Sequence, residues 1–218
     1  MEFLDCWTEL ALPDLLRLLA PAVFLLIAAL GPGVRIVRLA AIAVALTIPL
    51  VEELGVTPPF TIAWSALWLL IAWSTRGQEG SARRPLAARH GVIEASTVGL
   101  LLGVALLTLL IAAVARQALS PEEARRASYG ALLMMLGLIH LMLHGHVRRA
   151  GVAFGALGLG LQVLESAARE AQVFVIHNPG GAVLLATVLA SALAMRVASN
   201  REHVAGTAWV SDAHDLHD

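Results

Sequence analysis

The sequence predicts an all-α, polytopic integral membrane protein with about seven transmembrane helices. Of its 218 residues, 58% are hydrophobic and only 14% are charged, and the mean hydropathy is +0.78. Soluble domains carry about a quarter charged residues, so this composition is typical of a chain whose surface faces lipid. The apolar residues are also gathered in long stretches without Asp, Glu or Arg, and a helix needs about 20 such residues to cross a bilayer.

Seven stretches meet this description, although two of them are short. They are residues 18–34, 39–51, 54–75, 95–115, 127–147, 150–164 and 171–195. The second can be completed by Arg38, whose long side chain can reach the headgroups, and the sixth can extend through Glu165. The alternative for these two is a re-entrant or interfacial segment. We therefore expect seven spans.

The N-terminus reads "MEFLDCWTELALPD", which is acidic before any arginine occurs. A signal peptide begins with a positively charged region, so we expect the first span to stay in the mature protein. Cys6 is the single cysteine, which excludes an intrachain disulfide and a metal cage built from cysteines.

The arginines indicate an orientation. With the N-terminus outside, ten of the fifteen arginines fall in the inner connections, which agrees with the positive-inside rule. The connection "ARQALSPEEARRAS" places three of the other five outside. We expect a multi-pass protein of the cell's inner (cytoplasmic) membrane, with an external N-terminus and a cytoplasmic C-terminus.

The same connection contains a helix start. Ser120 can cap the free amide groups, Pro121 suits the first helical position, and Glu123 completes a capping box. This pattern predicts a short interfacial helix.

The stretch "HLMLHGHVRRAG" at residues 140–151 allows two interpretations. His140 and His144 lie four residues apart on one helix face, the spacing of a two-histidine metal site, and a haem held by His140 would need a further partner histidine. No Asp, Glu or Cys of the fifth or sixth span lies at the matching depth to complete such a site. We therefore favour a cytoplasmic turn that places His144, His146, Arg148 and Arg149 at the headgroups, and we expect no cofactor.

The helix after this turn is rich in glycine. Gly151 and Gly155 form a GxxxG pair, which Gly158 and Gly160 continue, so neighbouring helices can approach at backbone contact distance. The glycines do not form a nucleotide-binding loop, because no strand precedes them. We expect this surface to pack against a partner protein.

The order of a basic turn, a glycine-rich helix ending "QVLESAAR" and a last helix opening "HNPGGAVLLATVLASALAMR" resembles a known family. It looks like subunit K of complex I, the C subunit of Mrp-type antiporters and component E of formate-hydrogenlyase-type hydrogenases. Arg148 matches the family's basic loop. The last-helix signature is matched by Asn178, Pro179, Ala182, Val183, Leu184 and Thr187.

The resemblance covers about residues 127–200, and it implies a three-helix unit like the subunit K bundle. Residues 1–126 then form the N-terminal helices 1–4, and residues 201–218 form a polar cytoplasmic tail. The family implies a larger antiporter-like partner subunit, together with further subunits of the same complex.

One departure from the family concerns its proton relay. Leu157 stands where the family carries a membrane-embedded glutamate, and Asn178 replaces the aspartate of the last-helix signature. A charge inside the membrane is costly and is retained for ion transfer, so these changes indicate a degenerate relay. Glu94 and Glu165 are the remaining proton-path candidates, unless they only pair with Arg89 and Arg169 at the membrane boundaries.

These features predict a non-catalytic membrane subunit that supports proton or cation translocation by the lateral packing of a complex-I-, Mrp- or hydrogenase-related assembly. The sequence contains no nucleophile–base pair and no phosphate loop, and nothing in it indicates nucleic-acid binding. Two alternatives stay open. One is a membrane cytochrome or metal-binding protein that uses His140 and His144, and the other is a stand-alone small-solute transporter.

Overall fold

A computed structural model of the chain describes residues 7, 10–31, 34–51, 54–75, 120–143, 147–170 and 181–205. All regular structure in these residues is helical, as the sequence predicts. The elements are α2 (Leu12–Leu30), α3 (Val34–Thr47), the 3₁₀ turn η1 (Ile48–Leu50), α4 (Pro58–Ser74), α6 (Pro121–Leu143), α7 (Val147–Glu170) and α8 (Gly181–Ala205).

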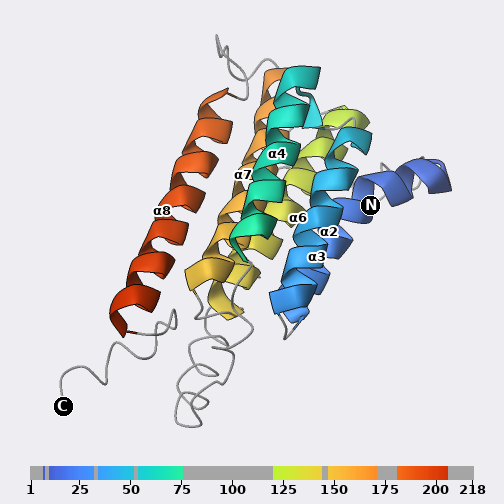
Figure 1. The fold of residues 1–218 in the computed structure, drawn as a ribbon. Coiled ribbons are helices and arrows are strands. Elements are labelled where there is room, and N and C mark those ends of the chain that lie inside the picture. The colour runs from blue at the N-terminus through green and yellow to red at the C-terminus, as the bar shows by residue number, and fades with distance from the viewer. Residues whose placement is uncertain are drawn as a thin grey trace.

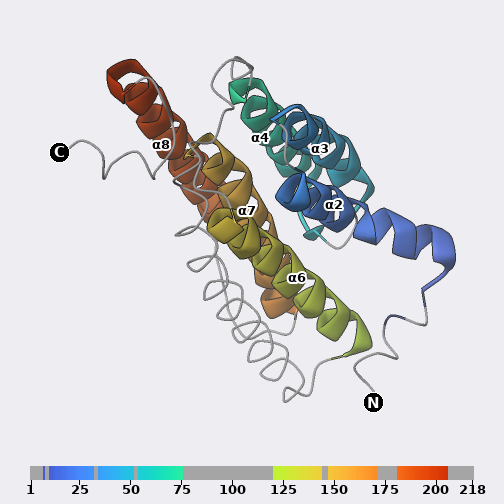
Figure 2. The same cartoon turned by 90° about the horizontal axis from the view of Figure 1, so that it is seen from below.

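The helices pack side by side in two rows. Seen from below, α6, α7 and α8 form one row, and α2, α3 and α4 form the other (Figure 2). Contacts between α2 and α6 and between α4 and α7 join the rows. The helix α7 is central, because α6, α8 and α4 all contact it, whereas α8 stands at one edge of the bundle (Figure 1).

The core of the bundle is one apolar cluster that includes Trp64, Trp68, Leu133 and Leu159. Many other large apolar side chains point outward, among them Leu70, which is 66% exposed. Such a surface is unfavourable in water and matches the hydrocarbon of a bilayer, which supports the assignment to the membrane.

Four of the described helices are long and apolar enough to cross a membrane. They are α2, α6 and the stretches Val147–Ala168 and Gly181–His203 of α7 and α8, while α4 is a shorter apolar helix. The sequence predicts six spans in the described part of the chain, and its remaining span, residues 95–115, lies outside it. In the described part of the chain, four of the six expected spans therefore have the length and composition to cross a membrane.

The shortfall has local causes at the second and third expected spans. The α-helical part of the second ends at Thr47, where the chain tightens into η1 around Pro49. The third begins only at Pro58, because Pro58 and Pro59 occupy the first helical turn, where their missing N–H groups cost nothing.

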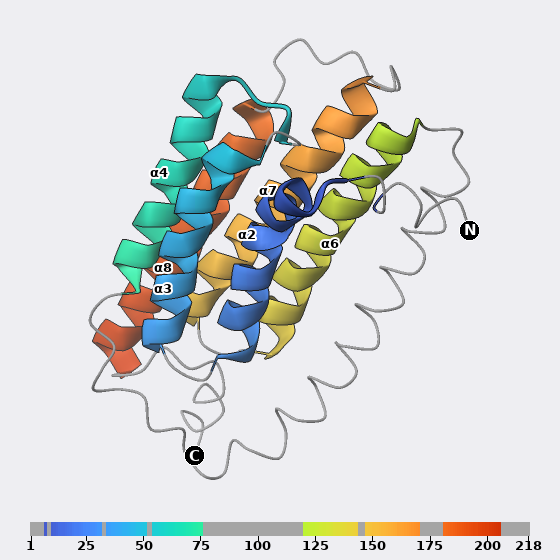
Figure 3. The same cartoon turned by 90° about the vertical axis from the view of Figure 1, so that its right-hand side faces the viewer.

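The helix α2 is bent. Its first turns project from the bundle to the right in Figure 1 and are seen nearly end-on in Figure 3. Pro21 lies inside this helix and cannot donate a hydrogen bond to the preceding turn, which explains a bend. Leu12 and Leu16, on the projecting turns, are exposed.

The predicted capping box is confirmed at the start of α6. The Ser120 amide donates to Glu123 Oε2 over 2.8 Å, and the Glu123 amide donates to Ser120 Oγ over 3.3 Å. However, the helix that begins here runs without interruption to Leu143. The expected separate interfacial helix is therefore the first part of the fifth span.

Candidate functional site

The two arginines of the predicted turn lie in the first turn of α7 and join several helices. Arg148 faces the Glu202 carboxylate of α8 with two nitrogens: Nε donates to Oε1 over 2.7 Å, and Nη2 contacts Oε2. Its Nη1 donates to the Ser74 carbonyl at the end of α4, over 2.7 Å. Arg148 therefore links α7 to α8 through a two-pronged ion pair and also satisfies a helix-terminal carbonyl.

Arg149 makes a second link at the same end of the bundle. Its side chain is 7% exposed, and Nη2 donates to the Gly31 carbonyl just after α2, over 3.0 Å. The arginine pair, Arg148 and Arg149, thus connects α7 with the ends of α2, α4 and α8. The predicted turn is therefore also a structural junction between helices. Arg149 is buried inside the protein, where an arginine that faces lipid would not be.

The structure supplies a partner for this junction that no sequence pattern indicates. The sequence predicts a polar tail from residue 201 that would include Glu202, but α8 continues to Ala205 and carries this glutamate to Arg148. The glutamate lies 54 positions from the arginine, so no local motif pairs them. The only sequence signal is an acidic residue near the end of an apolar stretch.

The four glycines expected to contact a partner protein instead contact helices of the same chain. An added Cβ at Gly155 would lie 3.0 Å from Trp68 of α4, and one at Gly160 would lie 2.6 Å from the Gly130 carbonyl oxygen of α6. Gly151 and Gly158 face Met195 and Thr187 of α8, respectively. The glycines therefore allow close approach of α7 to other helices of the chain, and their role in packing against a partner protein stays a prediction.

The middle of α7 is apolar. Leu157 packs against α6, where an added Cβ at Gly137 would lie 2.9 Å from its Cγ. Among the side chains of α7 that the structure describes, the buried polar ones are Arg149 toward one end and Gln162 and Ser166 toward the other. Arg149 and Gln162 are thirteen residues apart, about 20 Å along a helix.

Of the two proton-path candidates, the structure describes Glu165, which lies apart from the arginine pair. Glu165 is in the last two turns of α7, half-buried, with its Oε2 atom shielded from solvent. The expected pairing of Glu165 with Arg169 involves a side chain that the structure does not describe. Glu94 and Arg89 lie outside the described residues.

The metal alternative rests on one described histidine. His140 is buried at 2% exposure near the end of α6, whereas His144 and His146 lie outside the described residues. Among the residues that are described, no group of three or more His, Cys, Asp or Glu side chains could hold a metal ion. Within that part of the chain, the structure therefore does not bring a set of metal ligands to His140.

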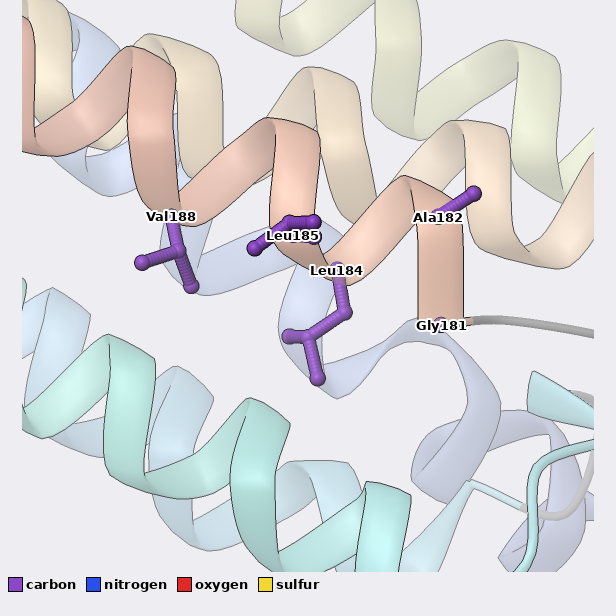
Figure 4. Close-up of a pocket in the computed structure, with 5 residues that line it drawn as sticks. All are labelled: Gly181, Ala182, Leu184, Leu185 and Val188. Atoms are coloured by element: carbon purple, nitrogen blue, oxygen red, sulfur yellow. The ribbon is translucent and has the colours of Figure 1, made fainter.

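The last-helix motif is described from Gly181 onward, so Asn178 and Pro179 are not. Thr187 is buried against Gly158, and its hydroxyl donates to the Val183 carbonyl over 2.7 Å. Ala182 and Leu184 instead line a groove of about 580 Å³, together with Gly181, Leu185 and Val188. Figure 4 shows Leu184 and Val188 pointing from α8 toward the side of α4.

No protein family, curated protein or solved structure matches the chain. The resemblance to the complex I, Mrp antiporter and hydrogenase subunits therefore depends on the order and spacing of the motifs alone.

Proposed function

We propose that the chain is a membrane-embedded packing subunit of a complex-I-, Mrp- or hydrogenase-related assembly, seated against a larger antiporter-like subunit. The observation that carries this proposal is the one-sided packing of α8. Its buried positions form a single stripe of small residues: Thr187, Ser191, Ala194 and Ala198. Such a stripe is typical of close helix packing in membranes, and here it is directed at the chain's own bundle.

The exposed positions of α8 from Ala182 to Leu193 are all apolar, and Arg196 is exposed beyond them. The large exposed apolar side chains of α8 are Leu185, Val188, Leu189, Leu193 and Val197. Lipid alone can cover such a face, but a second protein of complementary shape gains van der Waals contact there. The partner seat of this proposal therefore lies on the outer face of α8, in place of the buried glycines of α7.

The polar end of α8 supports a rigid role. The Arg148–Glu202 ion pair holds the end of α8 to α7 and, through the Ser74 carbonyl, to α4. A face held in a fixed position loses less conformational entropy when a partner binds, and this favours association. In this proposal the chain orients α8 for a neighbouring subunit.

The apolar middle of α7 supports an indirect part in translocation. With Leu157 packed on Gly137, the sixth span offers no titratable group at mid-depth. Proton or cation movement then belongs to the larger subunit, and Glu94 and Glu165 are the groups of this chain that can assist it.

Site-specific photocrosslinking tests the partner seat. A photoreactive amino acid replaces Leu189 on the outer face of α8, and the matched control replaces Leu26, an exposed leucine of α2. We expect Leu189 to give an adduct with a polytopic antiporter-like subunit identified by its sequence, and Leu26 to give little of it. A chain that purifies alone, monodisperse and fully active by itself would refute the proposal and favour a stand-alone transporter.

The translocation part has its own test. Glu94→Gln and Glu165→Gln are introduced into the assembled complex, and ion pumping is measured in vesicles. Loss of pumping in either variant assigns that carboxylate to the proton path. Unchanged pumping in both restricts the chain to a structural role.

A further inference from the structure

The projecting first turns of α2, residues 12–20, are amphipathic. Their apolar face consists of four leucines at the spacing of one helix face: Leu12, Leu15, Leu16 and Leu19. At about 100° per residue these leucines fall within an arc of about 100°, and Asp14 and Arg17 lie on the opposite side of the helix. Neither the resemblance nor the proposed function uses this segment.

Both faces of the segment are open to the surroundings. Leu12 and Leu16 are 68% and 61% exposed. Arg17 Nη1 lies 3.2 Å from Asp14 Oδ1, and both of these side chains are more than half exposed. Leu18 is buried and connects the segment to the apolar core. Much of the leucine face is therefore not covered by the bundle, and such a face is unfavourable in water.

The segment runs across the bundle and not along it. In Figure 3 the long helices are seen lengthwise, whereas these turns are seen nearly end-on, and in Figure 1 they extend sideways from the bundle. The helix continues into the bundle beyond Pro21. With the long helices crossing the bilayer, the segment lies close to the plane of the membrane.

The depth of the segment follows from its neighbours at the start of α6. Asp14 and Arg17 line a cavity of about 400 Å³ together with Glu122, Arg125 and Arg126. Charged side chains of a membrane-spanning helix gather near the headgroups, because their transfer into hydrocarbon is costly. The polar face of the segment is therefore next to the charged beginning of α6, at the headgroup level, and the leucine face is turned away from these charges.

We propose that residues 12–20 form an interfacial anchor, which lies in the plane of the membrane and inserts its leucine face into the lipid of the leaflet where α6 begins. Helices of this kind bury the apolar face about 5–10 Å into the boundary between headgroups and acyl chains. The exposed Asp14–Arg17 pair stays at the headgroups, where both charges remain hydrated. The partner of this surface is the bilayer itself, and the anchor fixes the height of α2 in the membrane.

Spin-label depth measurements on the full-length chain in phosphatidylcholine vesicles test the anchor. Cys6, the single cysteine, is replaced by Ser, and a nitroxide is attached after Leu12→Cys, Leu16→Cys, Asp14→Cys or Leu26→Cys, one at a time. The accessibility of each label to dissolved oxygen and to a water-soluble nickel complex gives its depth. Leu26, an exposed leucine of α2 beyond Pro21, is the matched control for a position in the hydrocarbon. All four labelled positions are exposed, so the labels do not disturb the core.

We expect the labels at Leu12 and Leu16 to lie at the same depth, about 5–10 Å below the phosphates, with the label at Leu26 deeper and the label at Asp14 accessible to the nickel complex. In a helix that crosses the membrane upright, Leu12 and Leu16 would differ in depth by about 6 Å, and that difference would overturn the proposal. Leucine labels that the nickel complex reaches as readily as the label at Asp14 would place the segment in water and refute the anchor. Leucine labels shielded from both oxygen and nickel would show that protein covers the face, which would overturn the assignment to lipid.

Discussion

Replacing Glu202 by Gln should loosen α8 from α7 while leaving the link from α7 to α4 in place. The substitution removes the charge that faces Arg148 Nε and Nη2, but the 2.7 Å hydrogen bond from Arg148 Nη1 to the Ser74 carbonyl does not involve Glu202. Arg148→Gln is the more severe change, because it removes both links.

The expected size follows from the burial of the pair. The side chains of Arg148 and Glu202 are 17% and 26% exposed, so they are neither freely solvated nor fully buried. Exposed ion pairs contribute less than about 1 kcal/mol, and hydrogen bonds to charged groups contribute about 1.5–3 kcal/mol. We expect Glu202→Gln to lower the free energy of unfolding by about 1–2 kcal/mol and Arg148→Gln by about 2–4 kcal/mol.

The assay is unfolding of the purified chain in mixed micelles of increasing SDS content, followed by tryptophan fluorescence, since Trp64 and Trp68 are buried in α4. A double-mutant cycle with Arg148→Gln and Glu202→Gln isolates the pair, and we expect a coupling of about 1–2 kcal/mol. Glu122→Gln, which breaks the exposed pair with Arg126, is the control and should cost less than about 1 kcal/mol. A coupling indistinguishable from zero would refute the reasoning.

Three further predictions use the same preparation. Gly160→Ala should lower the free energy of unfolding by about 1–3 kcal/mol, because the new Cβ meets the Gly130 carbonyl oxygen at 2.6 Å. Gly151→Ala should lower it less, since its new Cβ meets only the flexible end of Met195. Equal losses of stability would contradict this packing. Ser120→Ala should lower the stability by about 1 kcal/mol through loss of the capping box, and no change in the SDS midpoint would argue against that cap. His140→Ala should leave the absorbance spectrum and metal content of the purified chain unchanged, and loss of a stoichiometric haem or metal would favour the cytochrome alternative over a packing subunit.

Local features could be predicted from the sequence and contacts distant in sequence could not. The capping box at Ser120 involves residues three positions apart, so their types and spacing determine it. The close approach at Gly155 and Gly160 was also foreseeable, since a glycine stripe permits it wherever a helix is available. Which helices pack against these glycines depends on the fold, and here they are α4, α6 and α8 of the same chain.

The predicted spans end where charged residues occur, but the helices of the structure do not all end there. The last predicted span ends near Met195, before Arg196, Arg201 and Glu202, but α8 continues through all three to Ala205. A stretch free of Asp, Glu and Arg underestimates a helix whose terminal charge is paired, and Arg148 pairs Glu202. The opposite error occurs at residues 54–57, which are uncharged yet precede α4, because Pro58 and Pro59 set its start.

The distribution of polar groups constrains how the proposed subunit can take part in translocation. One junction, made by Arg148 and Arg149, ties four helices at one end of the bundle, and Glu165 and Gln162 lie toward the other. Between them α7 carries Leu157 and glycines against which residues of neighbouring helices pack closely. About 20 Å of apolar helix is too long for direct proton transfer between side chains, and each glycine here is closed by a tight contact. Apart from the assistance proposed for Glu94 and Glu165, the chain influences ion movement in our proposal by fixing the position of α8 against the larger subunit through which the ion moves. Arg148→Gln in the assembled complex should therefore reduce pumping only to the extent that it also reduces assembly.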